Sequence, residues 1–287
     1  MAVLTKPDFT LRQKNPSPST IPDPVWWLWL AFDALHPEVL LGGIYANKSG
    51  FHNTGKANKQ KWPSNYSIRD KINQSGPGWD KASALDLTFP DAQRGDYKNI
   101  DKYTSRLVAS SRDPNDPRLD MILFEFYGQA DSDREVEGYN EYREESVTSD
   151  SSHLWHIHLS FIRSKVGDWW GMWALYTVLA GWTVAQWKAS LPADAPKPPA
   201  PKPPAKPSGH KPGSRELRYV KGKPMMEGED VEYVQRWIGP KRMGPPDGIA
   251  GPKFDAGVRW YQDMRGIKVD GIVGPVTWRN MGVKVTY

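Results

Sequence analysis

The chain has 287 residues, among them 14 Trp, 26 Pro and no Cys, and its 38 basic and 33 acidic side chains give a net charge of +5. This length allows one large or two modest domains, and 38% hydrophobic with 25% charged residues is compatible with a soluble core. The absence of Cys excludes disulfides, thiol nucleophiles, iron–sulfur clusters and Cys-type zinc sites. Any metal must therefore be held by carboxylates and His. The His residues are His36, His52, His153, His156, His158 and His210.

Residues 1–191 contain a mixture of helix and strand patterns. The patterns predict helices over about 24–36 and 97–110, and strands at 40–46, 84–89, 119–129 and 153–162. These strands and helices do not alternate regularly. We therefore expect an α+β domain with a mainly antiparallel sheet.

The uncharged stretch 169–187 is long enough to resemble a membrane span. However, Gly181 is typical of the residue after a helix, and Thr183 with Gln186 fits a capping box for a second helix. The sequence thus predicts two short helices and no stable membrane insertion. The N-terminal residues are polar and lack the apolar core of a signal peptide.

Residues 192–212 hold nine prolines and two successive copies of APKPP, which predicts an extended, polyproline-like linker. Charge divides at the same place: residues 1–192 carry 21 basic and 23 acidic side chains, a net of −2, and residues 193–287 carry 17 and 10, a net of +7. This asymmetry predicts an anionic partner for the C-terminal part. Nucleotide-binding loops and zinc-finger spacings are missing, so we expect no nucleic-acid partner.

The C-terminal part contains an internal repeat, DGIAGP at 247–252 and DGIVGP at 270–275, around a helical pattern. These features predict a small all-α module of three helices. The segments DVEYVQRWIG and DGIAGPKFDAGVRWYQDMRGIKVDGIVGPVTWRNM resemble the type 1 peptidoglycan-binding domain over nearly all of 224–282. The resemblance implies attachment to bacterial peptidoglycan. Trp260 and Tyr261 could stack on sugar rings, although a core role is favoured.

Three of the six His lie in HLWHIH, at 153–158. Residues two apart in a strand point to the same face, so His156 and His158 should project together while Ile157 points into a core. His153 precedes the strand and could bend toward them. Two such imidazoles can share a metal or divide into a ligand and a proton-transfer group; a surface cluster without function is the alternative.

Two further ligands are needed for a catalytic zinc. Asp86 is the best carboxylate because it lies mid-strand among apolar neighbours, where an unpaired charge is costly. Asp80 is a weaker candidate, since a cap or turn would explain it. His52, in a loop, is the remaining credible imidazole. His36 precedes a proline at a predicted helix end, and His210 lies in the predicted linker.

The segments ASALDLTF at 82–89 and HLWHIHLSF at 153–161 resemble the Asp strand and the HxH strand of the M15 peptidases, zinc enzymes that cleave bacterial wall peptides. The resemblance covers about residues 40–165 and implies that Asp86, His158 and an upstream His bind Zn2+. The family usually has that His seven residues before the Asp, where this chain has Trp79. We therefore expect a rearranged loop that supplies His52 or, as the other option, His36.

A second alignment matches Trp155–His156 to the family's Trp-His pair. It would make His156 the ligand and would put His153 where the family often has Glu. In the first alignment, His156 is the general base or stabilises the oxyanion, and His153 supports it. We interpret the acidic segment 131–145 as a solvated insertion.

The two resemblances, with the lack of a signal peptide, imply a bacteriolytic bacteriophage endolysin, a monomeric zinc metallopeptidase that degrades peptidoglycan. Residues 1–191 would be the catalytic domain, 192–213 the linker and 214–287 the wall-binding domain. An endopeptidase and a carboxypeptidase would share these ligands. We expect the protein in the host cytoplasm before lysis and then at the cell wall, or else on the virion. The alternative is an inactive wall-binding structural protein of a virion, which Trp79 favours.

Overall fold

A computed structural model describes residues 3–113, 115–196, 209–243, 246 and 248–287. The chain forms two compact units, which are described separately. The first comprises Met1–Glu144 with Ser149–Pro201, and the second comprises Glu145–Thr148 with Lys202–Tyr287. Most of the predicted polyproline linker, residues 197–208, lies outside the described residues.

A six-stranded sheet has the order β1-β2-β6-β3-β4-β5, and the antiparallel pairs β1–β2, β2–β6, β6–β3 and β3–β4 form most of it. This arrangement confirms the α+β class. The strands are β1 (Leu40–Gly43), β2 (Ala84–Thr88), β3 (Leu123–Gly128), β4 (Glu137–Asn140), β5 (Glu145–Val147) and β6 (His156–Phe161).

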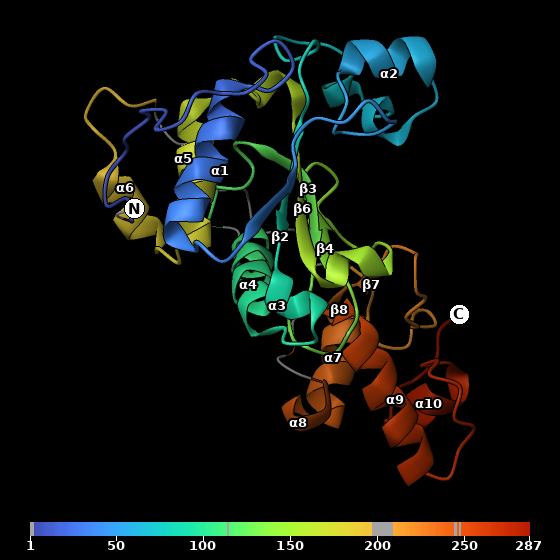
Figure 1. Cartoon of the computed structure of the whole chain (residues 1–287). Coiled ribbons are helices and arrows are strands. Elements are labelled where there is room, and N and C mark those ends of the chain that lie inside the picture. Colours follow the sequence, from blue (N-terminus) through green and yellow to red (C-terminus); the bar gives the residue numbers. More distant parts are fainter. Residues whose placement is uncertain (1–2, 114, 197–208, 244–245, 247) are drawn as a thin grey trace. The chain divides into compact units, whose positions relative to one another are not determined.

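Helices cover one face of this sheet (Figure 1). They are α1 (Asp23–Leu35), α4 (Lys98–Arg112) and α5 (Trp169–Leu179). Leu85 of β2 and Ile157 of β6 share a buried core with Trp27, Tyr103 and Trp173 of these helices. Successive side chains in a strand point to opposite faces of the sheet, so Asp86, next to Leu85, lies on the face that these helices leave open. His156 and His158, on either side of Ile157, lie on the same open face.

The uncharged stretch forms two helices, as predicted: α5 and α6 (Val184–Ser190). Gly181, with φ +80°, follows the C-cap of α5, and Thr183 and Gln186 form the capping box of α6. Within the described part of the chain, no helix is both long and apolar enough to cross a membrane.

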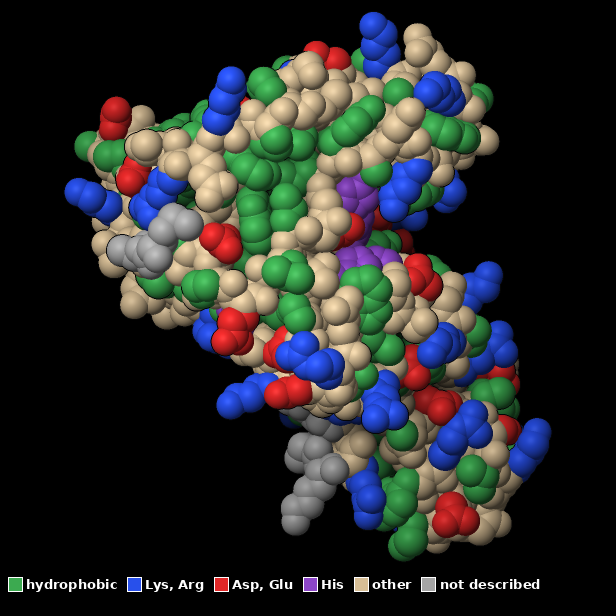
Figure 2. Space-filling view, viewed as in Figure 1, with side chains coloured by type: hydrophobic (Ala, Val, Ile, Leu, Met, Phe, Trp, Pro, Cys, Tyr) green, Lys and Arg blue, Asp and Glu red, His purple; other side chains and the backbone are tan. Residues whose placement is uncertain are grey.

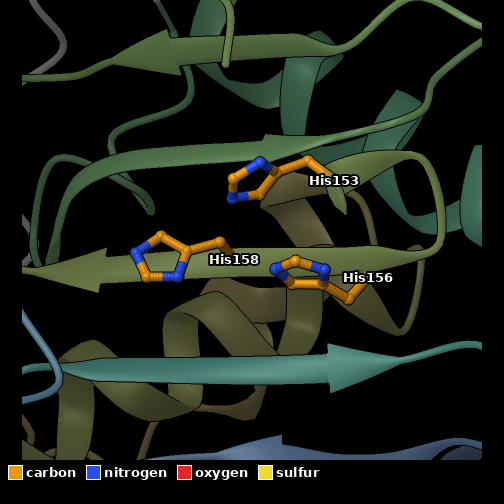
Figure 3. A group of neighbouring side chains, drawn as sticks. All are labelled: His153, His156 and His158. Atoms are coloured by element: carbon orange, nitrogen blue, oxygen red, sulfur yellow. The ribbon is translucent and has the colours of Figure 1, made fainter. Parts of the chain in front are cut away.

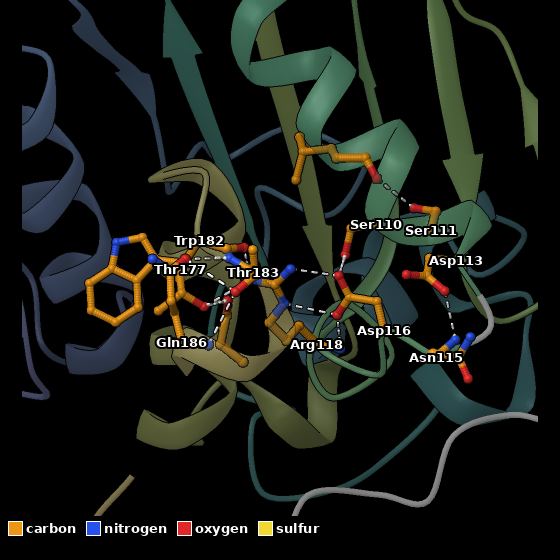
Figure 4. A network of polar contacts seen from close by, with 12 residues as sticks. Ser110, Ser111, Asp113, Asn115, Asp116, Arg118, Thr177, Trp182, Thr183 and Gln186 are labelled. Atoms are coloured by element: carbon orange, nitrogen blue, oxygen red, sulfur yellow. Dashed lines mark hydrogen bonds and ion pairs between the residues drawn. The ribbon is translucent and has the colours of Figure 1, made fainter. Parts of the chain in front are cut away.

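A buried ion pair ties these helices to α4 (Figure 4). The guanidinium of Arg118 donates to both carboxylate oxygens of Asp116, at 2.8 and 2.6 Å, and Asp116 also accepts from Ser110 of α4 at 2.8 Å. Arg118 further donates to Thr177 of α5 and to the carbonyl of Trp182. This network fixes the end of α4 against the α5–α6 turn.

The chain between β1 and β2 builds a separate layer. It contains α2 (Gly55–Lys61) and the 3-10 helices η1 (Tyr66–Ile68) and η2 (Lys71–Asn73). A second small core, formed by Phe51, Ala84, Phe124 and Ile162, joins this layer to the sheet. The remaining short elements of the first unit are α3 (Pro90–Gln93), η3 (Ser151–Leu154) and η4 (Arg163–Lys165).

The acidic segment 131–145 is more ordered than predicted, because it contributes all of β4 and the start of β5. Residues in β4 alternate between intermediate and full burial. The pairing of β4 with β3 explains this pattern, which the many charged residues conceal in the sequence.

The second unit contains the three predicted helices, α7 (Glu229–Ile238), α9 (Pro252–Met264) and α10 (Pro275–Asn280), with the short helix α8 (Pro240–Met243). A two-stranded pairing of β7 (Met226–Glu227) with β8 (Ile249–Ala250) adds to them. Each DGIxGP copy turns through a left-handed glycine, Gly248 or Gly271, and starts a helix with its proline. Tyr261 is buried and donates to the carbonyl of Asn280, which agrees with a core role.

Candidate metal centre

Three distant segments bring His52, Asp86 and His158 together on the open face of the sheet. Asp86 and His158 are cross-strand partners in β2 and β6, and His52 comes from the loop before α2. Nε2 of His52 lies 3.0 Å from Oδ2 of Asp86, and Nδ1 of His158 lies 2.7 Å from Oδ1 of Asp86. The carboxylate is therefore held between two imidazoles, one on each oxygen.

Hydrogen bonds fix the orientation of the His52 ring. Its Nδ1 lies 3.0 Å from the carbonyl oxygen of Ile44, which can only accept, so Nδ1 carries the proton. In the neutral ring, Nε2 then presents a lone pair to the carboxylate of Asp86. Two facing acceptors need a cation between them, either a proton or a metal ion.

Ser160 performs the equivalent task for His158. Its hydroxyl lies 2.9 Å from Nε2 of His158 and is fully buried. A hydroxyl can donate or accept, so Ser160 can pair with either tautomer of this ring. When Ser160 accepts from Nε2–H, Nδ1 of His158 has no proton, and its lone pair faces Oδ1 of Asp86, as a metal ligand would.

This donor set fits zinc. Ligand atoms of His52, Asp86 and His158 all lie within 4.8 Å of one another. A tetrahedral zinc with bonds of about 2.0–2.2 Å separates its ligand atoms by about 3.3 Å. The observed separations of 2.7 and 3.0 Å therefore need only small adjustments. Two imidazoles and a carboxylate leave a fourth position for water or substrate, as in catalytic zinc sites.

Asp86 remains ionised in this position. Burial raises the pKa of Asp86, but when a proton is the cation on each imidazole, the hydrogen bonds from His158 and His52 and the charge of these rings hold that pKa far below its ordinary value. A deprotonated carboxylate is the form that binds a metal ion.

Two more imidazoles face the same space (Figure 3). His156 is on β6, and its Nε2 lies 4.0 Å from Oδ1 of Asp86; His153 is on η3, with its ring 4.6 Å from that of His156. Nδ1 of His156 lies 2.8 Å from the carbonyl oxygen of Ser152, and Nδ1 of His153 lies 3.2 Å from that of Asp150. Nε2 of each ring therefore carries the free lone pair.

The environment keeps both rings neutral at pH 7. Burial lowers the pKa of His153 to about 4, assisted by repulsion from His156 and His158. Burial also lowers the pKa of His156, an effect that attraction by Asp86 opposes. Neutral His156 can accept a proton at Nε2, whereas His153 is a much weaker base and is better suited to hydrogen bonding.

Acidic and phenolic groups from β3 and η1 lie near the cluster. Glu125 and Tyr127 are on β3, and Asn140 donates to Glu125 at 3.0 Å. Burial raises the pKa of Glu125, although attraction by His158 opposes this. Burial and repulsion from Glu125 and Asp86 raise the pKa of the Tyr66 hydroxyl to about 12. These groups are hydrogen-bonding candidates at the rim of the centre.

The His side chains lie in a hollow of the molecular surface, beside an acidic side chain (Figure 2). The side chain of Asp86 is 19% exposed and that of His52 is 9% exposed. The centre is thus accessible to a substrate while it is largely shielded from water.

The structure brings together all five predicted site residues, His52, Asp86, His153, His156 and His158. The other candidates lie elsewhere. Nδ1 of His36 is 3.1 Å from the Tyr103 hydroxyl, on the helical side of the sheet, and Asp80 is exposed. The geometry favours His158 over His156 as the ligand, because His158 is closer to Asp86.

Trp79 has a packing role that accounts for the missing His at this position. Its ring lies directly against Gly55, where an added Cβ would overlap it at 2.2 Å, and its carbonyl accepts from Lys56 at 3.0 Å. Trp79 therefore holds the start of α2, and the imidazole comes from the loop before that helix. Sequence reasoning missed Ser160, although its position two residues after His158 was a usable signal.

Comparison with known proteins identifies a domain within the C-terminal unit. Residues 227–281 match the family model described as a peptidoglycan binding domain. An uncharacterized protein encoded in the bpoA1 3′ region of Kitasatospora aureofaciens is 52% identical over 40 residues. That match covers 14% of this chain and 34% of the relative, so the chain spans about a third of the relative's length.

No solved structure matches the chain. The chain carries a peptidoglycan-binding domain, and this domain associates it with the bacterial cell wall.

Proposed function

We propose that the N-terminal unit is a zinc-dependent peptidase that hydrolyses a peptide bond of bacterial peptidoglycan. The observation that carries the proposal is the convergence of His52, Asp86 and His158 beside His156. These ligands would hold Zn2+, which would polarise the scissile carbonyl and increase the acidity of water at this position.

The chain's own groups supply the proton transfers. Nε2 of His156 would accept the proton of the attacking water and return it to the leaving amine, because its ring is neutral and its Nδ1 is fixed by Ser152. His153, whose Nδ1 is held by the carbonyl of Asp150 and whose ring lies 4.6 Å from that of His156, would orient His156. Asp86 stays ionised throughout.

The C-terminal domain would keep this centre close to its polymeric substrate. Attachment to the wall raises the local concentration of peptide bonds without new contacts at the catalytic centre. A wall-binding domain joined to a peptidase suits a bacteriophage endolysin, which acts on the wall of its host.

The test uses the full chain, because both units are needed on the wall. Zinc content is measured by atomic emission, and hydrolysis by the turbidity of purified cell walls, for the wild type and Asp86→Asn. We expect about one zinc per wild-type chain, clearing of walls, and loss of both in Asp86→Asn. Chelation should abolish clearing, and added Zn2+ should restore it.

His36→Gln is the matched control, since His36 lies outside the cluster and its removal should leave zinc content and clearing unchanged. Mass spectrometry of the released fragments identifies the bond. A wild-type protein that pellets with walls, holds no zinc and releases no fragments would instead be a wall-binding structural protein.

A further inference from the structure

A fully buried arginine lies behind the loop that supplies His52. Arg163 begins η4, directly after β6, and is 0% exposed. Its guanidinium donates to the carbonyl of Asn53 at 3.0 Å and to that of Gly50 at 3.4 Å. His52 lies between these two contacts, so one side chain holds the loop on both sides of the imidazole.

The same guanidinium connects this loop to its neighbours. It donates to the carbonyl of Lys81 at 3.3 Å, in the segment that leads into β2, and to the Ser67 hydroxyl at 3.0 Å, in η1. It also lies 5.3 Å from the ring centroid of Phe51. Among the described residues, the hydrogen-bond partners of its side chain are carbonyls and a hydroxyl, with no carboxylate.

Such a buried guanidinium is costly, because desolvation is not offset by an opposite charge. Burial lowers the pKa of Arg163 to about 10, so the group is still charged at pH 7. A lysine could not replace it. The planar guanidinium directs its N–H groups to carbonyls on several sides at once, and a compact ammonium cannot reach all of them. The contacts of Arg163 therefore indicate a specific task in holding this loop.

The loop needs such support because His52 and Asp86 are far apart in the sequence. The amide of Ala46, just after β1, donates to the His52 carbonyl at 2.9 Å, and the amide of Ser83, just before β2, donates to the Phe51 carbonyl at 2.8 Å. We propose that Arg163 is a positioning residue that fixes the His52 imidazole for metal binding. This inference rests on the metal centre of the proposed function. It adds the residue that holds His52, the ligand supplied by a loop and not by a strand, in place.

The test compares Arg163→Lys with Arg118→Lys, a buried arginine of similar exposure in the separate network with Asp116. Zinc affinity is measured on metal-free full-length protein by competition with a chromophoric chelator, and folding by thermal unfolding. Arg163→Lys should weaken zinc binding about 10–100-fold, as for other residues that orient metal ligands. Arg118→Lys should lower the unfolding midpoint and change zinc affinity by less than about threefold.

A double-mutant cycle separates positioning from general destabilisation. In a His52→Ala background, Arg163→Lys should change the remaining zinc affinity by less than about twofold, since the ligand through which it acts is absent. An equal effect of Arg163→Lys in both backgrounds would overturn the inference. If Arg163→Lys does not fold, Ser67→Ala, which removes one partner of the guanidinium, takes its place in the cycle with a smaller expected loss.

Hydrogen exchange gives a readout that does not require metal. In metal-free Arg163→Lys, the amides of Ala46 and Ser83 should exchange faster than in the wild type, while amides of α4 should not. If the wild type binds no zinc, the proposed function fails, and unchanged exchange at these two amides would then overturn the positioning role as well. If the wild type binds zinc and Arg163→Lys binds it equally well, the positioning inference alone fails.

Discussion

His52 and Asp86 face each other across the site with Nε2 of the imidazole 3.0 Å from Oδ2 of the carboxylate. The Nδ1 proton of His52 is already committed to the Ile44 carbonyl, so this short contact joins two acceptors unless a cation lies between them. The pair therefore requires a cation, either a proton or a metal ion, between the imidazole and the carboxylate.

His52→Ala should weaken zinc binding by at least about 100-fold, because it removes one of three protein ligands. His36→Ala should have no such effect, since His36 contacts Tyr103 instead. Equilibrium competition with a chelator measures both. Equal zinc affinity of His52→Ala and the wild type would exclude His52 as a ligand.

The roles of the two His residues in β6 can be separated by the same method. His158→Ala should lose zinc, because His158 contacts Asp86 at 2.7 Å. His156→Ala should retain zinc and lose about 10²–10⁴-fold in the rate of wall hydrolysis, the range for removal of a general base. The reverse result, zinc loss in His156→Ala alone, would support the alignment in which His156 is the ligand.

Much of this centre was predictable because it lies on regular strands. Period-two alternation places His156 and His158 on one face, and the apolar surroundings of Asp86 indicate a buried, partnered carboxylate. The register that pairs Asp86 with His158 depends on tertiary structure and has no local signal.

The loop and the acidic segment were harder to predict for different reasons. His52 lies in an irregular loop whose shape depends on Arg163 and on Asn58, which donates to the Gly50 carbonyl at 2.7 Å. Such contacts between distant residues leave no periodic pattern. Charged residues also concealed β4, which pairs with β3 and alternates in burial.

Gly42 should be sensitive to substitution because it lies against Asp86. A Cβ at Gly42 would be 2.7 Å from the Cβ of Asp86 and 2.7 Å from Oγ1 of Thr88. Gly42→Ala should therefore displace β1 or β2, lower the free energy of unfolding by about 1–3 kcal/mol and weaken zinc binding. Gly167→Ala is the control, since its Cβ would meet no atom within 4 Å. Wild-type stability in Gly42→Ala would show that β1 moves without cost.

Glu137 should make stability fall as pH rises. Burial and then repulsion by Asp131 and Asp133 raise its pKa to about 9, from 4.5 for the isolated side chain. Between these values the folded state binds more protons than the unfolded state, so the free energy of unfolding decreases with increasing pH. Glu137→Gln removes this contribution and should stabilise the N-terminal unit at pH 8.5 but not at pH ~4.

Thermal unfolding at several pH values measures this difference, with Glu38→Gln as the control at an exposed carboxylate. Both variants lose one negative charge, so an effect of overall charge would appear in both. A pH-independent difference between Glu137→Gln and the wild type would contradict a raised pKa of Glu137.

Trp237 is the aromatic side chain of the peptidoglycan-binding domain best placed to contact sugar rings. It is 47% exposed and stacks on Tyr233 at 5.9 Å, and Tyr233 is anchored to the Met281 carbonyl. Trp260, by contrast, packs on the core under the guanidinium of Arg242. Trp237→Ala should therefore reduce the fraction of protein that pellets with purified walls while the unfolding midpoint stays nearly unchanged. Val269→Ala, at a similarly exposed apolar residue, should leave pelleting intact; equal losses in the two variants would indicate that exposed apolar area, and not the aromatic ring, binds the wall.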